Sequence, residues 1–400
     1  MHEWRGRSMN QPKLAMYRAA IRRKLGRLLG RGVTDYPPSP AGAALSPSLG
    51  YRAVAADLRP DNSFPKNGTG DDITQWQVGA RRTLAALTGW EADRPSVSVT
   101  HRVPAVEISR QGIVREAVYL RVRAETDVPV HLLRPAGPEP QGGWPVAIIL
   151  SGSTSGVHLA YGAVRVPVDH VLLGYGADLG LQAVERGYLA VCIEQIGYAE
   201  RREQVLTSRS ASPTIDAANH ALLVGRTLMG DKAMDVSSVL DWLMDGADLS
   251  IDRNRIFLFG HSTGGTAALY CTALDTRIRG TLASGCVGWV RDTLMTRRAT
   301  DGDGIVPGLL RHFEADDLVA LAAPRPFVAL SGDRDHIFPF EGTDAVVESA
   351  RSVYRALGNA AGLESVRVDG PHRYYPTPSW AAWRRVIDAF PEPSAGPQNR

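Results

Sequence analysis

Hydrophobic residues in the second half of the chain fall into short apolar runs separated by longer stretches with helical spacing. Each short run is typical of a strand that is buried on both faces. These runs cover residues 146–150, 188–195, 255–260, 280–286, 326–332 and 365–370. Helical spacing of apolar positions occurs at 215–244 and again behind residue 262. Repeated β-α-β alternation predicts an α/β fold with a mostly parallel central sheet and helices on both faces.

Upstream of these runs the pattern changes to period-two alternation. Residues 96–109, 116–126 and 128–135 alternate apolar and polar positions, which predicts an antiparallel edge of the sheet. Residues 33–95 are rich in Pro, Gly, Ala and Asp, and one helical pattern stands out at 73–87. This region is therefore expected to be irregular apart from that helix.

On these patterns the chain divides into three parts. We expect an N-terminal helical and irregular extension at 1–95 that packs on the core, a large α/β domain at 96–390, and a flexible tail at 391–400. Within the extension, residues 12–29 place apolar side chains at helical spacing beside many basic ones. Such a helix is expected to pack its apolar stripe on its own domain. The alternatives are a membrane surface or another subunit, and hence a homo-oligomer.

Composition narrows the class of protein further. Hydrophobic residues make up 44% of the chain and charged residues 22%, which are globular values, and a net charge of +3 is too small to indicate a nucleic-acid partner. Cys192, Cys271 and Cys286 lie in apolar segments without metal-ligand spacing, so we expect no metal, no cofactor and a reducing, cytoplasmic location. Apolar runs are too short for a membrane span, and the N-terminus lacks the apolar stretch of a signal peptide.

Candidate chemistry begins with GHSTG at residues 260–264, a match to the pattern G-x-S-x-G. In a chain with 40 glycines among 400 residues, chance supplies about 0.25 such matches, so the pentapeptide alone decides little. Its surroundings decide more, because Ser262 lies between an expected strand and an expected helix. Gly260 and Gly264 permit the close approach that a sharp strand-to-helix turn requires. The sequence therefore predicts a nucleophile elbow with Ser262 as the nucleophile.

A serine hydroxyl needs a histidine to accept its proton and a carboxylate to orient that histidine. Asp333 and Asp335 follow one late strand, and His372 follows the next, which is the α/β-hydrolase order. His336 adjoins the candidate acids and would leave the last loop unused, so His372 is the expected base. Asp335 lies further out on its loop, before a proline, and is the expected acid. Asp333 is then expected to form a turn or to pair with an arginine such as Arg334.

Backbone N–H groups must also bind the oxyanion of a tetrahedral intermediate. Thr263, at the start of the helix after the serine, is expected to supply one of them. The loop SGSTSG at 151–156 is expected to supply the other, from Ser153 or, as second choice, from Thr154. An ordinary Gly/Ser-rich turn is the alternative for this loop, but its position directly after the strand at 146–150 favours the oxyanion role.

Several longer motifs occur in a fixed order. They read GDKAMDVSSVLDWL, IDRNRIFLFGHSTGG, ALDTRIRGTLASG, APRPFVALSGDRDHIFP and GPHRYYP. On these motifs residues 146–390 resemble the α/β-hydrolase superfamily, and within it the bacterial acetyl xylan esterase and dienelactone hydrolase-like group. The resemblance implies Ser262 as nucleophile, Asp335 as acid and His372 as base. One departure is Ser151, because relatives often have His-Gly where this chain has Ser-Gly.

The expected function is cleavage of a carboxylic ester through an acyl-enzyme on Ser262. The expected substrate is a small molecule: a short acyl ester, a sugar acetyl ester, or a natural-product ester or lactone. One alternative is a prolyl-oligopeptidase-like peptidase, which the lack of an upstream propeller repeat disfavours. The other is a biosynthetic acyltransferase, or another non-hydrolytic protein on the same fold.

Two insertions are the expected source of the substrate pocket. Residues 157–180 and 287–317 would lie above the strand ends, where pockets form in α/β proteins. Trp289, Tyr161 and Tyr374 are candidate wall residues, and each is equally consistent with ordinary packing.

Overall fold

The computed structural model describes residues 40–390, apart from 109–111, 208–209, 211, 213 and 298–301. The expected basic helix at 12–29 and the expected tail at 391–400 lie outside the described residues. The chain divides into two compact units, Met1–Val54 and Ala55–Arg400. Helix α2 (Pro47–Asp57) begins in the first unit, and the sheet with its covering helices belongs to the second.

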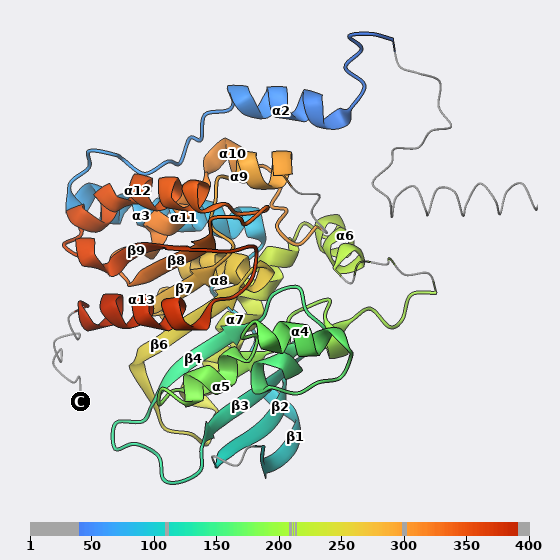
Figure 1. The fold of residues 1–400 in the computed structure, drawn as a ribbon, viewed down its shortest axis with the longest axis vertical. Helices are drawn as coiled ribbons and strands as arrows, with labels where there is room; N and C mark the ends of the chain where they lie inside the picture. Colours follow the sequence, from blue (N-terminus) through green and yellow to red (C-terminus); the bar gives the residue numbers. More distant parts are fainter. Residues whose placement is uncertain are drawn as a thin grey trace, which may run out of the picture. The chain divides into compact units, whose positions relative to one another are not determined.

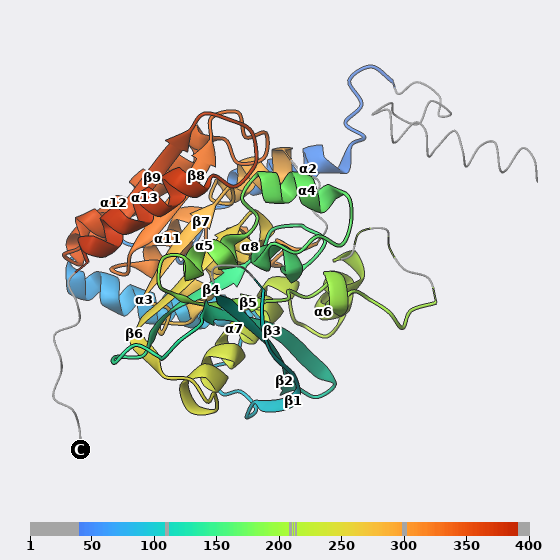
Figure 2. The ribbon, with the colours of Figure 1, turned by 60° about the horizontal axis from the view of Figure 1, so that its bottom comes forward.

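The described residues form one nine-stranded sheet in the order β1-β2-β3-β5-β4-β6-β7-β8-β9 (Figure 1). The strands are β1 (Ser98–Glu107), β2 (Ile113–Arg123), β3 (Thr126–Pro135), β4 (Trp144–Leu150), β5 (Leu189–Ile193), β6 (Ile251–His261), β7 (Gly280–Ser284), β8 (Phe327–Gly332) and β9 (Leu363–Val368). Strands β1, β2, β3 and β5 pair antiparallel, and all pairs from β5 to β9 are parallel. Turned by 60°, the sheet shows a strong twist between β1 and β2 at one edge and β8 and β9 at the other (Figure 2).

Helices cover both faces of this sheet, as the apolar pattern predicts. One core contains buried side chains of α3 (Gly70–Thr88), α7 (Leu228–Asp245), α8 (Thr263–Leu274), α11 (Ala315–Ala322) and α12 (Phe340–Ala356). The core on the opposite face contains those of α5 (Leu179–Val184) and α13 (Pro376–Asp388). Figure 1 shows α12 and α13 on opposite sides of β8 and β9. The α/β-hydrolase fold predicted from the sequence is confirmed.

Shorter elements lie in the connections between these layers. They are η1 (Val157–Tyr161), α4 (Val168–Gly174), η2 (Ala199–Arg201), α6 (Ile215–Leu223), α9 (Val290–Asp292), η3 (Thr293–Arg297), α10 (Leu309–His312) and η4 (Ala360–Gly362). Across all helices in the described part of the chain, none combines the length and the apolar character needed to cross a membrane.

Helix α3 anchors the segment before the sheet. Thr69 begins it with a capping box, in which its side chain and that of Asp72 each accept a backbone N–H of the other residue. Gly89 ends it in the left-handed conformation. Ile73 and Leu84 are 1% and 0% exposed and lie in the same core as α8 and α12. Residues 70–88 are therefore part of the hydrophobic core of the second unit.

The prediction of one helix over residues 215–244 is wrong, because the chain forms α6 and α7 with a break between them. Gly225 takes φ +74°, which ends α6, and the Thr227 side chain accepts the N–H of Gly230 to begin α7. Thr227 also donates to the carbonyl of Thr88 at 2.9 Å. The break allows α7 to begin next to the end of α3. The apolar spacing is helical on both sides of the break, so the sequence pattern does not indicate it.

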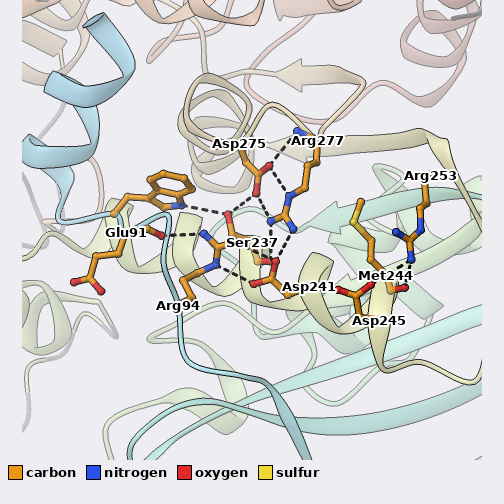
Figure 3. A network of polar contacts seen from close by, with 10 residues as sticks. Glu91, Arg94, Ser237, Asp241, Met244, Asp245, Arg253, Asp275 and Arg277 are labelled. Carbon is orange, nitrogen blue, oxygen red and sulfur yellow. Dashed lines mark hydrogen bonds and ion pairs between the residues drawn. The ribbon is translucent and has the colours of Figure 1, made fainter. Parts of the chain in front are cut away.

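A polar network joins the segment after α3 to helices α7 and α8 (Figure 3). Arg94 and Arg277 both bind the carboxylate of Asp241, at 3.0 and 2.5 Å. Arg277 also binds Asp275 at 2.6 Å, and Asp275 accepts a hydrogen bond from Ser237 at 2.7 Å. Partly buried ion pairs add little net stability, but they fix geometry. This network connects α7 to the residues directly after α8, the helix that follows Ser262.

Candidate active site

Ser262 lies in the turn between β6 and α8, at the carboxyl edge of the parallel strands. Its φ of +54° is a left-handed value that costs a residue with a side chain about 1–3 kcal/mol. The turn is tight because no Cβ fits on either flanking glycine. A Cβ on Gly260 would lie 2.3 Å from the Gly264 carbonyl oxygen, and one on Gly264 would lie 2.1 Å from that of Leu150. The surrounding backbone therefore holds Ser262 in its strained conformation.

A chain of two hydrogen bonds links Ser262 to side chains from two other loops. His372, in the loop after β9, lies with Nε2 3.0 Å from Ser262 Oγ. Its Nδ1 lies 2.6 Å from Oδ2 of Asp335, in the loop after β8. Because a carboxylate oxygen can only accept, Nδ1 carries the proton and Nε2 is free to accept the proton of the Ser262 hydroxyl. This arrangement can activate a serine as a nucleophile.

Asp335 is held by its own loop as well as by His372. Its Oδ1 accepts the backbone N–H groups of Ile337 and Phe338, both at 2.8 Å. Burial alone would raise the pKa of Asp335, but the hydrogen bond and charge of His372 and these two N–H groups outweigh it, so the pKa lies below its ordinary value. The carboxylate is therefore ionised throughout the neutral range.

The other candidate acid and base point elsewhere. Asp333 accepts the N–H of Gly370 at 2.9 Å and lies 3.7 Å from Arg334. The N–H of Gly370 is also the largest cause of the lowered pKa of Asp333. His336 is exposed, and its ring lies 6.1 Å from that of His372 without a hydrogen bond to it. The structure thus brings Ser262 and His372 together with Asp335 rather than with Asp333.

The imidazole ring of His261 lies beside that of His372, with ring centres 5.3 Å apart. Burial, and then the charge of His372, lower the pKa of His261 to about 3. Its Nδ1 lies 3.1 Å from the carbonyl oxygen of Ser284, which is the acceptor for a ring N–H. His261 is therefore neutral at ordinary pH and does not repel a positive charge that forms on His372.

The loop after β4 lies against the turn that contains Ser262. A Cβ on Gly152 would lie 3.2 Å from Cβ of Ser262. The Ser153 hydroxyl donates to Oγ1 of Thr263 at 3.4 Å. Tyr198, which sequence reasoning missed, donates from its hydroxyl to Oγ of Ser153 at 3.2 Å. Its position shortly after β5, at the same edge of the sheet, is the signal that was available in the sequence.

A buried ion pair contacts Tyr198. Lys232 Nζ lies 2.6 Å from Asp303 Oδ1, with side chains 2% and 6% exposed. The other oxygen of Asp303 lies 3.5 Å from the Tyr198 hydroxyl, and Lys232 stands 5.6 Å from the Tyr198 ring centre. Burial is the main cause of a raised pKa of Tyr198, so the phenol keeps its proton and can donate it to Ser153.

Two cavities meet at Ser153. The outer cleft, of about 290 Å³, contains Ser262 and His372 and is lined by parts of 151–154, 172–179, 261–262, 337 and 372–374. The inner cavity, of about 50 Å³, shares Ser153 with the cleft. It is also lined by Thr263 and mainly by apolar side chains of α8, of 286–294 and of 315–318. Residues 157–180 thus contribute to the outer cleft, and residues 287–317 contribute to the inner cavity.

The three candidate wall residues lie in different parts of the structure, and one of them lines the outer cleft. Tyr374 and Thr154 line the outer cleft. Tyr161 lines neither cavity: it packs on His131 with ring centres 5.0 Å apart, beneath the guanidinium of Arg115. Trp289 also lines neither, and borders a separate hollow beside α12. Cleft residues that the sequence did not single out include Tyr175 and Arg373.

Metal-ligating side chains do not gather anywhere in the part of the chain that the structure describes. Cys192, Cys271 and Cys286 are buried free thiols, and burial raises the pKa of each.

A mostly parallel sheet with helices on both faces, and a Ser–His–Asp hydrogen-bond chain at its carboxyl edge, define the class of the α/β-hydrolases. A model of the Abhydrolase family (Abhydrolase_7) matches residues 46–350, and the chain belongs to this family. The match includes Ser262 and Asp335 and ends before His372.

Individual proteins of known sequence or structure are also similar to this chain. YtaP of Bacillus subtilis (strain 168), described only as a hydrolase, is 28% identical over 297 residues, which are 73% of this chain and 92% of YtaP. A Bacteroides fragilis structure described as an acetyl xylan esterase superposes with a TM-score of 0.64 at 18% identity and covers 89% of each chain. A glucuronoyl esterase from Solibacter usitatus gives 0.59 at 16% identity, over 83% of this chain and 97% of that one. The predicted resemblance to acetyl xylan esterase-like α/β-hydrolases is confirmed.

Proposed function

We propose that this protein hydrolyses a carboxylic ester with a short acyl group through an acyl-enzyme on Ser262. The observation that carries the proposal is the continuous hydrogen-bond chain from Ser262 Oγ through His372 to Asp335. Ser262 and His372 line a cleft that is large enough for a small ester. The name of one structural neighbour, an acetyl xylan esterase, supports a short acyl group carried on a sugar or a similar polar alcohol.

In the first half of the reaction, His372 Nε2 accepts the proton of Ser262 as Oγ attacks the ester carbonyl. The imidazolium that results is stabilised by Asp335, whose carboxylate is ionised at neutral pH. His372 then donates its proton to the leaving alcohol. In the second half the same nitrogen accepts a proton from water, which attacks the acyl-enzyme and releases the acid.

The oxyanion is expected to bind to the backbone N–H groups of Thr263 and Ser153. Thr263 is the first residue of α8, and the first N–H groups of a helix have no acceptor within it. The positive end of the helix dipole favours an anion there. The contact between the Ser153 and Thr263 hydroxyls keeps the two backbone segments adjacent.

Tyr198→Phe is expected to lower kcat about 3–10-fold with little change in KM, because one supporting hydrogen bond to Ser153 is lost. The ring, its packing and the nearby ion pair of Lys232 and Asp303 remain. Steady-state kinetics with p-nitrophenyl acetate measure the effect. An unchanged kcat would show that the Ser153 loop holds its position without Tyr198.

Acyl length is expected to be limited by the inner cavity. The cavity begins at Ser153 and Thr263, where the carbonyl oxygen would bind, so the acyl chain points into it. Its volume of about 50 Å³ compares with roughly 10–15 Å³ for one buried water, so it admits an acyl group of a few carbon atoms. Leu269, Leu318 and Phe338 form apolar walls that favour a hydrocarbon chain.

A series of p-nitrophenyl esters from acetate to octanoate tests this function. We expect kcat/KM to be highest between acetate and butyrate and to fall about 10–100-fold by octanoate, because overpacking a filled cavity costs about 1–3 kcal/mol. Labelling of the wild type by a fluorophosphonate probe serves as the companion measurement. A folded protein that is neither labelled nor active on any ester of the series would contradict the proposal.

A further inference from the structure

The outer cleft contains a cation directly beside the proposed base. Arg373 follows His372 in the chain, and its side chain lines the cleft together with Ser262. Its guanidinium carbon lies 5.2 Å from the ring centre of Tyr175 and 4.8 Å from that of Tyr375. Two aromatic rings therefore hold the guanidinium by cation–π contacts, which engage its faces and leave its in-plane N–H donors available.

No protein group takes up those donors in the described part of the chain. Arg373 forms no ion pair and donates no hydrogen bond to any described residue, and its Nε is buried without a partner. Arginines on neighbouring segments differ in this respect: Arg334 binds Asp369, and Arg367 lies 3.5 Å from Glu341. Arg373 is thus a positioned cation without a counter-ion.

Among the described residues, the walls of the outer cleft supply no negative charge either. None of the side chains that line it is Asp or Glu, and Arg373 is the only Lys or Arg among them. His261, the histidine beside the base, is neutral at ordinary pH. A planar guanidinium with free edge donors matches a carboxylate, which it binds through two parallel hydrogen bonds.

The chemistry of ester cleavage tells which half of the substrate meets Arg373. The alcohol oxygen has to lie within hydrogen-bond reach of His372 Nε2 to receive its proton. The part of the cleft next to His372, where Arg373 lies, is therefore the alcohol side. The acyl side leads past Ser153 and Thr263 into the inner cavity, which Arg373 does not line.

We propose that the outer cleft selects esters whose alcohol half carries a carboxylate, and that Arg373 binds this carboxylate while Tyr175 and Tyr375 hold the guanidinium in place. An O-acylated sugar acid or hydroxy acid has this chemistry. The inference rests on the proposed ester hydrolysis. It specifies in addition that the alcohol half of the ester is negatively charged.

Matched acetate esters test the selection. The substrates are 3-acetoxybenzoate and its neutral methyl ester, which share the acyl group and the phenolic leaving group. With the wild type we expect kcat/KM for the carboxylate to exceed that for the methyl ester about tenfold or more. In Arg373→Gln the ratio between the two substrates is expected to fall about 10–100-fold, because a charge-assisted hydrogen-bond pair is lost. Arg373→Lys is expected to restore part of the ratio, since it keeps the charge and loses the planar fork.

Arg334→Gln is the matched control, because Arg334 is 64% exposed and paired with Asp369 on the neighbouring loop. Its ratio is expected to equal that of the wild type. Equal rates on both substrates in the wild type, or an unchanged ratio in Arg373→Gln, would overturn the inference while leaving ester hydrolysis intact. A stronger Arg373-dependent preference for 3-acetoxyphenyl phosphate would also overturn it in favour of a phosphate. Failure of the proposed function looks different, because the neutral methyl ester is then not cleaved either.

Discussion

Ser262→Ala is expected to abolish fluorophosphonate labelling and to lower kcat for p-nitrophenyl acetate by about 10⁴-fold or more. The change removes the oxygen that lies 3.0 Å from His372 Nε2 and leaves no other hydroxyl in the same position. A residue with a Cβ already occupies this strained turn, so the backbone is expected to keep its conformation. Mass spectrometry of the labelled protein and steady-state kinetics measure the two effects.

A second serine offers a matched control. Ser155, His158 and Asp169 form another Ser–His–Asp cluster, in which Ser155 Oγ lies 2.5 Å from Asp169 and His158 Nε2 lies 2.9 Å from the same carboxylate. Ser155→Ala is expected to retain labelling. Labelling that survives in Ser262→Ala and disappears in Ser155→Ala would move the nucleophile to the other cluster.

Geometry separates these two clusters although their residue types are the same. His372 uses one ring nitrogen for the serine and the other for the aspartate. When Nε2 accepts a proton, the positive charge on the ring is therefore stabilised by the carboxylate at Nδ1. His158 turns a single nitrogen toward both partners, and its Nδ1 is buried without a partner among the described residues. Ser155 also lies outside the lining of the outer cleft. The second cluster therefore fits a role in holding the loop that carries α4.

Much of the site could be predicted from the sequence because of where parallel strands end. In a doubly wound sheet the carboxyl ends of the strands meet at one edge, so residues just after β6, β8 and β9 come together whatever their separation in the chain. Ser262, Asp335 and His372 are such residues. Asp335 and Asp333 follow the same strand, and only the direction of the loop shows which of them reaches His372.

Other parts of the site depend on packing that no local pattern encodes. Tyr161 and Trp289 lie in the insertions above the sheet, yet their rings turn away from the outer cleft. Tyr198 points toward Ser153 from a loop with no motif of its own. Arg373 lies within the motif GPHRYYP, but that motif indicates a role for His372 alone. The direction of a loop side chain is set by its contacts, such as the stacking of Arg373 on Tyr175, which comes from a distant segment. Such contacts become visible only in the folded chain.

Asp335→Asn is expected to lower kcat about 10²–10⁴-fold while the protein remains folded. The amide oxygen of Asn still accepts the N–H groups of Ile337 and Phe338, so the loop after β8 keeps its shape. The NH₂ group then faces His372 Nδ1 and donates to it, which places the ring proton on Nε2. In that tautomer His372 no longer accepts the proton of Ser262. Steady-state kinetics with p-nitrophenyl acetate, and thermal unfolding to check the fold, measure the outcome.

Asp333→Asn is the matched control for this change, two residues away on the same loop. Asp333 accepts the N–H of Gly370 at 2.9 Å, and an amide oxygen is able to accept the same hydrogen bond. The variant loses only exposed charge contacts with Arg334 and Arg367, which are worth little in water. We therefore expect its kcat to stay within about threefold of the wild type. A larger loss in Asp333→Asn than in Asp335→Asn would contradict the assignment, because it would mean that the carboxylate orienting His372 during turnover is Asp333.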